Sequence, residues 1–224
     1  AATESSTVVG RVNGTVTIVD GNTATTASDT ITDVTLSNYG NSTVTSNVLD
    51  TVNLTGATTA SGTLALNITA ADTSTRATTL TLNMAGGSVG AISGTQADLY
   101  TTVNVVSTAA STIADVSIDK ATTLNVSGAG VTTFTQNQSV AVLATVTSTG
   151  GGLSLGTALG TGVTFTGGAG VETISIGATT KAITAIKRMM CLMALPCNPT
   201  STHNQIVLIK HTRLPRSNGA LGFV

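Results

Sequence analysis

A glycine-rich stretch holds the clearest chemical pattern in this sequence. Residues 167–175 read GGAGVETIS and fit the nonapeptide G-G-x-G-x-D-x-U-x, with glutamate in place of aspartate and Ile174 at the large apolar position U. In that pattern the glycine half turns tightly and offers carbonyl oxygens to Ca²⁺, the acidic side chain adds a carboxylate, and U enters the core. A single copy also fits a plain glycine-rich turn between two strands.

The composition of the chain indicates which type of secondary structure surrounds this stretch. Only 8% of the residues are charged and 2% are aromatic, the mean hydropathy is +0.36, and threonine makes up about a quarter of the segment 1–182. Such a chain is too apolar for a disordered protein, and no apolar run approaches the roughly 20 residues of a membrane-spanning helix. Threonine is β-branched and favours pleated backbone. We therefore expect an all-β protein that does not insert into a membrane.

Short strand-like phrases recur along residues 1–183. Each alternates an apolar residue with threonine or asparagine, as a half-buried strand does, and no stretch before position 183 shows a convincing helical stripe. The steps between phrases are 18, 28, 23, 21, 22 and 17, about 21 on average. This spacing predicts a parallel β-solenoid, and a β-sandwich is the alternative. The phrases begin at Val34, Val52, Leu80, Val103, Leu124, Val146 and Val163.

The chain changes character after position 183. All ten acidic residues precede this point, whereas residues 184–224 hold five of the nine basic residues, both cysteines, both histidines and all three prolines. The net charge of −1 is thus an average over two unlike segments, and it gives no indication of nucleic-acid binding. We expect a β-solenoid over 1–183 and a foreign, irregular and poorly ordered tail over 184–224.

A frame shift shortly after Ile183 would explain the tail. Two nonapeptides make one coil of about 18 residues, so the next acidic ligand after Glu172 is expected at position 190. That position holds Met190, preceded by Met189. If the preceding codon ends in G, the bases G-ATG-ATG read GAT-GAT in a neighbouring frame and encode Asp-Asp. The rival reading is a genuine appendage, but the spacings of Cys191 and Cys197 and of His203 and His211 do not match a zinc site.

Other acidic residues favour structural roles. Asp29/Asp33 and Asp115/Asp119 are the closest acidic pairs in the segment 1–183, and we expect turn or solvated positions rather than a catalytic pair. Asp20 and Asn22 could ligate Ca²⁺, but a turn is the simpler interpretation. A polysaccharide-acting β-helical enzyme and a β-helical adhesin are the alternatives to a structural, non-enzymatic protein.

The body resembles the crystalline-lattice region of calcium-dependent bacterial surface-layer (S-layer) proteins of the Caulobacter type, which are RTX-like proteins exported by type I secretion. The likeness runs in order over about residues 8–183. The segments that carry it are 10-GRVNGTVTI-18, 51-TVNLTG-56, 122-TTLNVSG-128, 163-VTFTGGAG-170 and 177-GATTKAI-183.

The resemblance implies a secreted, Ca²⁺-binding β-solenoid at the cell surface that packs with copies of itself into a two-dimensional lattice. It implies carbonyl ligands from Gly168 and Gly170 and a carboxylate ligand from Glu172. Anchoring to lipopolysaccharide belongs to a region of the family that this sequence does not match. Glutamate is one methylene longer than the family's aspartate, and the tail replaces the partner coil, which weakens the expectation of Ca²⁺ binding in this chain.

Overall fold

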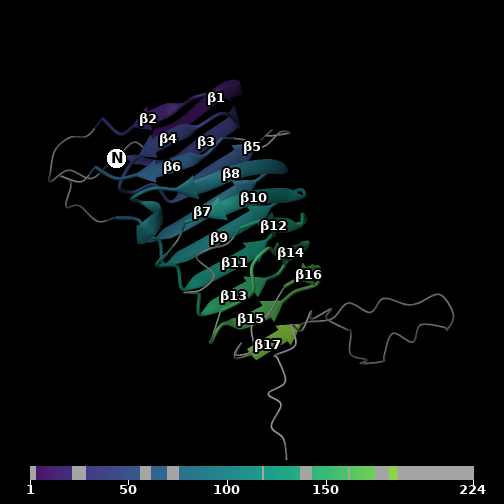
Figure 1. Ribbon diagram of the computed structural model, residues 1–224. Helices are drawn as coiled ribbons and strands as arrows, with labels where there is room; N and C mark the ends of the chain where they lie inside the picture. The colour runs from purple at the N-terminus through teal and green to yellow at the C-terminus, as the bar shows by residue number, and fades with distance from the viewer. Residues whose placement is uncertain are drawn as a thin grey trace, which may run out of the picture.

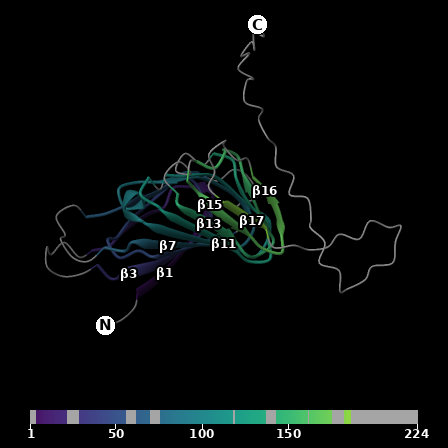
Figure 2. The same cartoon turned by 90° about the horizontal axis from the view of Figure 1, so that it is seen from below.

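The structure, a computed structural model, describes residues 4–21, 29–55, 62–69, 76–117, 119–136, 143–160, 162–174 and 182–185. These residues form two parallel β-sheets, and the chain passes from one sheet to the other at each successive strand. The strands stack one above another along a single axis, with β1 and β2 at one end and β16 and β17 at the other (Figure 1; Figure 2). The fold is the predicted all-β parallel solenoid, and the β-sandwich alternative is excluded because every described strand pair is parallel.

We call the two sheets sheet A and sheet B. Sheet A contains the odd-numbered strands: β1 (Glu4–Gly14), β3 (Ile31–Tyr39), β5 (Thr51–Thr55), β7 (Thr79–Met84), β9 (Thr102–Ser107), β11 (Thr123–Ser127), β13 (Thr145–Ser148), β15 (Thr164–Gly167) and β17 (Ala182–Ala185). Sheet B contains the even-numbered strands: β2 (Thr17–Val19), β4 (Ser42–Thr45), β6 (Leu64–Asn67), β8 (Gly87–Ser93), β10 (Ser111–Val116), β12 (Thr132–Phe134), β14 (Gly152–Leu155) and β16 (Val171–Thr173). Between β8 and β9 lies one turn of 3₁₀ helix, η1 (Ala97–Leu99).

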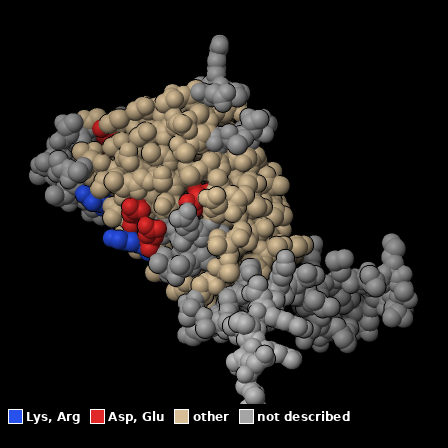
Figure 3. Space-filling model, viewed as in Figure 1, with Lys and Arg blue, Asp and Glu red and all other residues tan. Residues whose placement is uncertain are grey.

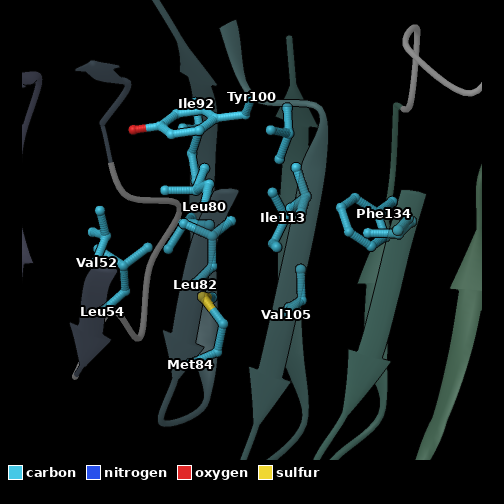
Figure 4. Packing of buried hydrophobic residues seen from close by; sticks show 14 of the residues in the cluster. Val52, Leu54, Leu80, Leu82, Met84, Ile92, Tyr100, Val105, Ile113 and Phe134 are labelled. Atoms are coloured by element: carbon cyan, nitrogen blue, oxygen red, sulfur yellow. The ribbon is translucent and has the colours of Figure 1, made fainter. Parts of the chain in front are cut away.

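The core lies between the two sheets and is built from columns of apolar side chains. Alternation along each strand sends one set of side chains inward; in β7, for example, Leu80, Leu82 and Met84 are buried and the residues between them are not. Parallel pairing then places apolar residues of adjacent strands in register. Leu82, for example, lies between Val52 on one side and Val105 on the other. Figure 4 shows these side chains packed together inside the solenoid.

All seven phrases identified in the sequence form successive strands of sheet A, from β3 to β15. Two of the six steps between phrase starts differ by two positions from the strand register. Val52 pairs with Leu82 rather than Leu80, and Val146 pairs with Phe165 rather than Val163. The difference between phrase spacing and register is two positions in both cases. Side chains on one face of a strand repeat every second position, so a shift by two leaves the same face inward.

The boundary expected at position 183 falls inside a strand. β17 pairs with β15, with Ile183 opposite Phe165, and the pairing continues through Thr184 and Ala185. Ile183 follows its partner Phe165 by the coil length expected for two nonapeptides, about 18 residues. The rest of the expected foreign tail, 186–224, lies outside the described residues, as does Asn22.

Candidate metal site and the polar corner

The glycines of the nonapeptide form the turn that joins β15 to β16. A side chain at Gly168 would place its Cβ 2.5 Å from the carbonyl oxygen of Ser148, and one at Gly170 would collide with the backbone of Gly151. Ser148 ends β13, and Gly151 lies in the turn that follows it before β14, which is the equivalent turn of the preceding coil. Glycine is therefore required here because successive turns stack with their backbones in contact, whether or not an ion binds.

Glu172 occupies an inward position of sheet B. Parallel register aligns it with Leu153, which in turn aligns with Thr132, and both of these side chains are fully buried. Glu172 itself is half-buried. Its Oε1 atom accepts a hydrogen bond of 3.3 Å from the backbone N–H of Gly168. The carboxylate thus bends back over the glycine turn, near the last described strands of the solenoid.

Ile174, the predicted core residue of the nonapeptide, is buried, with 3% of its surface exposed. It lies two positions after Glu172, so both side chains leave the strand on the same side. The alternation expected from the motif is confirmed at this position. The arrangement leaves a carboxylate and an apolar side chain side by side at the last described strand of sheet B.

The described residues supply only part of a calcium site. Calcium takes six to eight oxygen ligands, whereas Glu172 is the one carboxylate at this turn, and the group that contacts it is an N–H donor of Gly168 rather than a carbonyl oxygen. Within the described part of the chain, no three His, Cys, Asp or Glu side chains gather around a common point. Ca²⁺ binding through Gly168, Gly170 and Glu172 stays a prediction, and it requires further oxygens.

The two acidic pairs have separate surroundings. Asp29 is buried, and its Oδ2 accepts the backbone N–H of Asn47 at 2.6 Å. Asp33, in β3, accepts the hydroxyl of Thr32 at 2.8 Å. Asp115 is half-buried in β10, whereas Asp119 is exposed in the following turn. Asp29 lies just before β3 but is buried rather than solvated, and Asp33 lies within β3 rather than in a turn.

Asp20 fixes the corner at which the chain returns from sheet B to sheet A. Its buried carboxylate accepts the backbone N–H groups of Thr30 at 2.6 Å and Ile31 at 2.9 Å, at the start of β3. A carboxylate that accepts backbone N–H groups forms charge-assisted bonds, which are stronger than neutral ones. The turn interpretation of Asp20 accounts for these contacts.

Further polar side chains are buried at the same corner in the following coils. The side chain of Asn47 exchanges two hydrogen bonds with the backbone of Thr69, and Gln96 donates from Nε2 to the carbonyl of Ala77 at 3.0 Å. The hydroxyl of Tyr100 donates to the carbonyl of Leu49 at 2.7 Å, and burial raises the pKa of this phenol above its usual range. We call Asp20, Asn47, Gln96 and Tyr100 the polar corner.

The polar corner was not predicted from the sequence. Its members are spaced by 27, 49 and 4 positions, so no motif marks them. The available signal is positional, since Asp20, Asn47 and Gln96 each follow a strand of sheet B by one to three positions. Their contacts fix the turn into β3 and join backbone segments of different coils, which is a structural role.

Neither a protein-family model nor a curated protein matches this chain. Among the residues that the structure describes, none belongs to a helix of the length and apolar character that crossing a membrane would demand.

Proposed function

We propose that this chain is a segment of a secreted, self-assembling protein layer on a bacterial cell surface, of the S-layer kind that its sequence resembles. The observation that carries the proposal is that each of the two described end strands of sheet B exposes a large apolar side chain. The end strand β2 exposes 58% of Val19, and the end strand β16 exposes 74% of Val171. These are the largest exposed fractions of any large apolar side chain among residues 14–174 for which the structure describes burial.

End strands of a sheet offer unpaired N–H and C=O groups and are templates for pairing with another chain. Each end strand also has an exposed apolar side chain, and the removal of this apolar area from water is favourable. The face of the solenoid in view in Figure 3 carries few charges, since acidic and basic side chains occupy a small part of it. Contacts between copies at these ends would extend the stack and contribute to an ordered array, with other copies of the chain as the partner.

Calcium enters the proposal at the β16 end of sheet B. Stacking a further coil on β16 would bury the inward-facing Glu172, and a buried carboxylate requires a partner of opposite charge. A bound Ca²⁺ would supply this charge. We therefore expect assembly to depend on Ca²⁺.

The experiment is a calcium titration of the purified chain, followed by light scattering and electron microscopy. Ordered sheets with Ca²⁺ and monomers with a chelator are the expected result. Val171→Lys places a charge on the exposed end and should reduce assembly. Val131→Lys is the matched control, because Val131 is 38% exposed but lies within the stack rather than at its end. Monomers at every calcium concentration, or equal assembly of both variants, would exclude the proposal.

The two alternatives, a polysaccharide-acting enzyme and an adhesin, rest on the fold class alone. A monomer that cleaves a polysaccharide without calcium would favour the enzyme. No contact among the described residues favours either alternative over a coat.

A further inference from the structure

The outer face of sheet A carries two straight columns of short polar side chains. One column consists entirely of threonine, and its members are in register from strand to strand: Thr79, Thr102, Thr123, Thr145 and Thr164. The second column lies two positions further along the same five strands: Thr81, Asn104, Asn125, Thr147 and Thr166. We call these ten residues the threonine array.

The threonine array is a regular two-dimensional grid. Adjacent strands lie about 4.8 Å apart, and residues i and i+2 of a strand lie about 6.6 Å apart. The register is unbroken from β7 to β15, whereas the pairing of β1 with β3 contains shifts. The oxygen rows on the faces of crystalline ice repeat at comparable distances in two directions.

The side chains of the threonine array are also held in fixed orientations before any ligand binds. Threonine is stiff at χ1 because it is β-branched. In the second column, Asn125 donates to Asn104 across the strands at 3.0 Å, which orients both amides. The array residues are half-buried or exposed, and none of them is charged. A surface whose groups already lie in place loses little conformational entropy when it binds.

We propose that the threonine array binds the surface of ice. Each threonine offers a hydroxyl that can donate and accept, together with a methyl group beside it. Hydroxyls on a fixed grid can hold a layer of water molecules at the spacing of the ice crystal. The methyl groups beside them are removed from bulk water when the array contacts ice. None of the ten residues of the array is aromatic, as a platform for a sugar would be, and none is charged, as a site for an ionic ligand would be.

Sheet B of the same molecule provides an internal control. Its outer face has one column of hydroxyl side chains: Ser88, Thr112, Thr133, Ser154 and Thr173. Two positions further along the strands, Thr135 keeps a hydroxyl, but Gly90, Ala114 and Gly156 break the pattern. Sheet B therefore presents a single row rather than a grid.

The test uses the calcium-free chain, so that its result is independent of assembly into a layer. Nanolitre osmometry measures the gap between melting and freezing points and the shape of the growing crystal. A fluorescently labelled sample shows whether the protein remains on an ice surface. The unmodified chain is expected to facet ice crystals, widen the gap and stay on the ice.

Two matched variants locate the binding face. Thr123→Lys places a long charged side chain in the middle of the array and should abolish most of the gap. Thr133→Lys makes the same change on the outer face of sheet B, in the following strand β12, and should retain the gap. Circular dichroism checks the fold, and Thr123→Val, which keeps the shape but removes the hydroxyl, replaces Thr123→Lys if that variant is unfolded. Round, unfaceted crystals with the unmodified chain, or equal losses in both lysine variants, would overturn the proposal.

Discussion

The two outer faces of the solenoid differ although the two sheets share one core. Sheet A presents threonine or asparagine at two successive outward positions of five consecutive strands. Sheet B presents one column of hydroxyls whose neighbours along the strands are mostly glycine, alanine or valine, with Thr135 as an exception. Inward, both sheets bury mostly Leu, Val and Ile, although one inward column of sheet B also contains Ser111, Thr132 and Glu172. Stability requires the inner pattern on both sheets, but it does not require the grid on sheet A. The regularity of that face therefore points to a surface role.

The largest effect is expected inside the core that both faces share. Leu82→Ala removes a fully buried side chain that lies between Val52 and Val105. We expect a loss of about 2–5 kcal/mol in the free energy of unfolding, because the cavity cannot be filled by neighbours of fixed register. Urea denaturation measures it, and Thr81→Ala, the adjacent outward residue, is the control. Equal losses for the two variants would contradict the division into inner and outer faces.

A smaller loss is expected at the polar corner, where sheet B returns to sheet A. Tyr100→Phe removes the hydroxyl that donates to the carbonyl of Leu49 and leaves that acceptor without its partner. The expected loss is about 1–3 kcal/mol. Denaturation at pH 7 measures it, and an unchanged stability would show that the bond contributes nothing net.

The same residue predicts a dependence on pH. Burial raises the pKa of Tyr100 in the folded state above its value of about 10 in the unfolded chain. Its contribution to stability is then complete below pH 10 and is lost as the pH rises beyond that value towards the folded pKa. Stability should fall above pH 10, and the fall should be shallower in Tyr100→Phe. Parallel curves for both proteins would assign the alkaline loss to other groups.

On the outer face of sheet A, the amide pair gives a still smaller effect. Asn125→Ala removes the hydrogen bond to Asn104, and cross-strand pairs of this kind contribute about 0.2–1 kcal/mol. Thr112→Ala on sheet B is the comparison, since its neighbours in the hydroxyl column, Ser88 and Thr133, carry no amide. A larger loss for Thr112→Ala would reverse the ranking of the two faces.

The smallest effect concerns the hydroxyls themselves. Thr123→Val and Thr133→Val keep the β-branched shape on sheet A and sheet B respectively, and both should change stability by less than about 0.5 kcal/mol. Thermal unfolding measures both. Ice shaping should nevertheless be lost only in Thr123→Val, and this would separate surface function from folding.

Strand positions and strand faces were predictable from local pattern. Alternation of apolar residues with threonine located all seven phrases of sheet A and the face that each buries, because the period of two belongs to each strand separately. Most strands of sheet B were not recognised. Several are very short, such as β12 and β16, and so short a run contains too few alternations to stand out.

The candidate metal site was predictable only in part. The motif placed Ile174 in the core, and the structure confirms its burial. The motif could not show that Gly168 and Gly170 are required by contact with the turn of the preceding coil, because that contact joins residues one full coil apart in the sequence. Whether the glycines also serve an ion depends on oxygens that the turn itself does not contain.

The sequence by itself determined that the chain is all-β, that its strands recur at the spacing of a solenoid coil, and that apolar side chains lie on one side of each strand. These properties depend on residue type and on the near neighbours along the chain. The tertiary structure decided which residues stand in register. Coil length varies with the connecting segments, and a shift by two positions preserves the buried face, so only packing between coils selects Leu82 as the partner of Val52. The threonine array and the inward position of Glu172 exist only once that selection has been made.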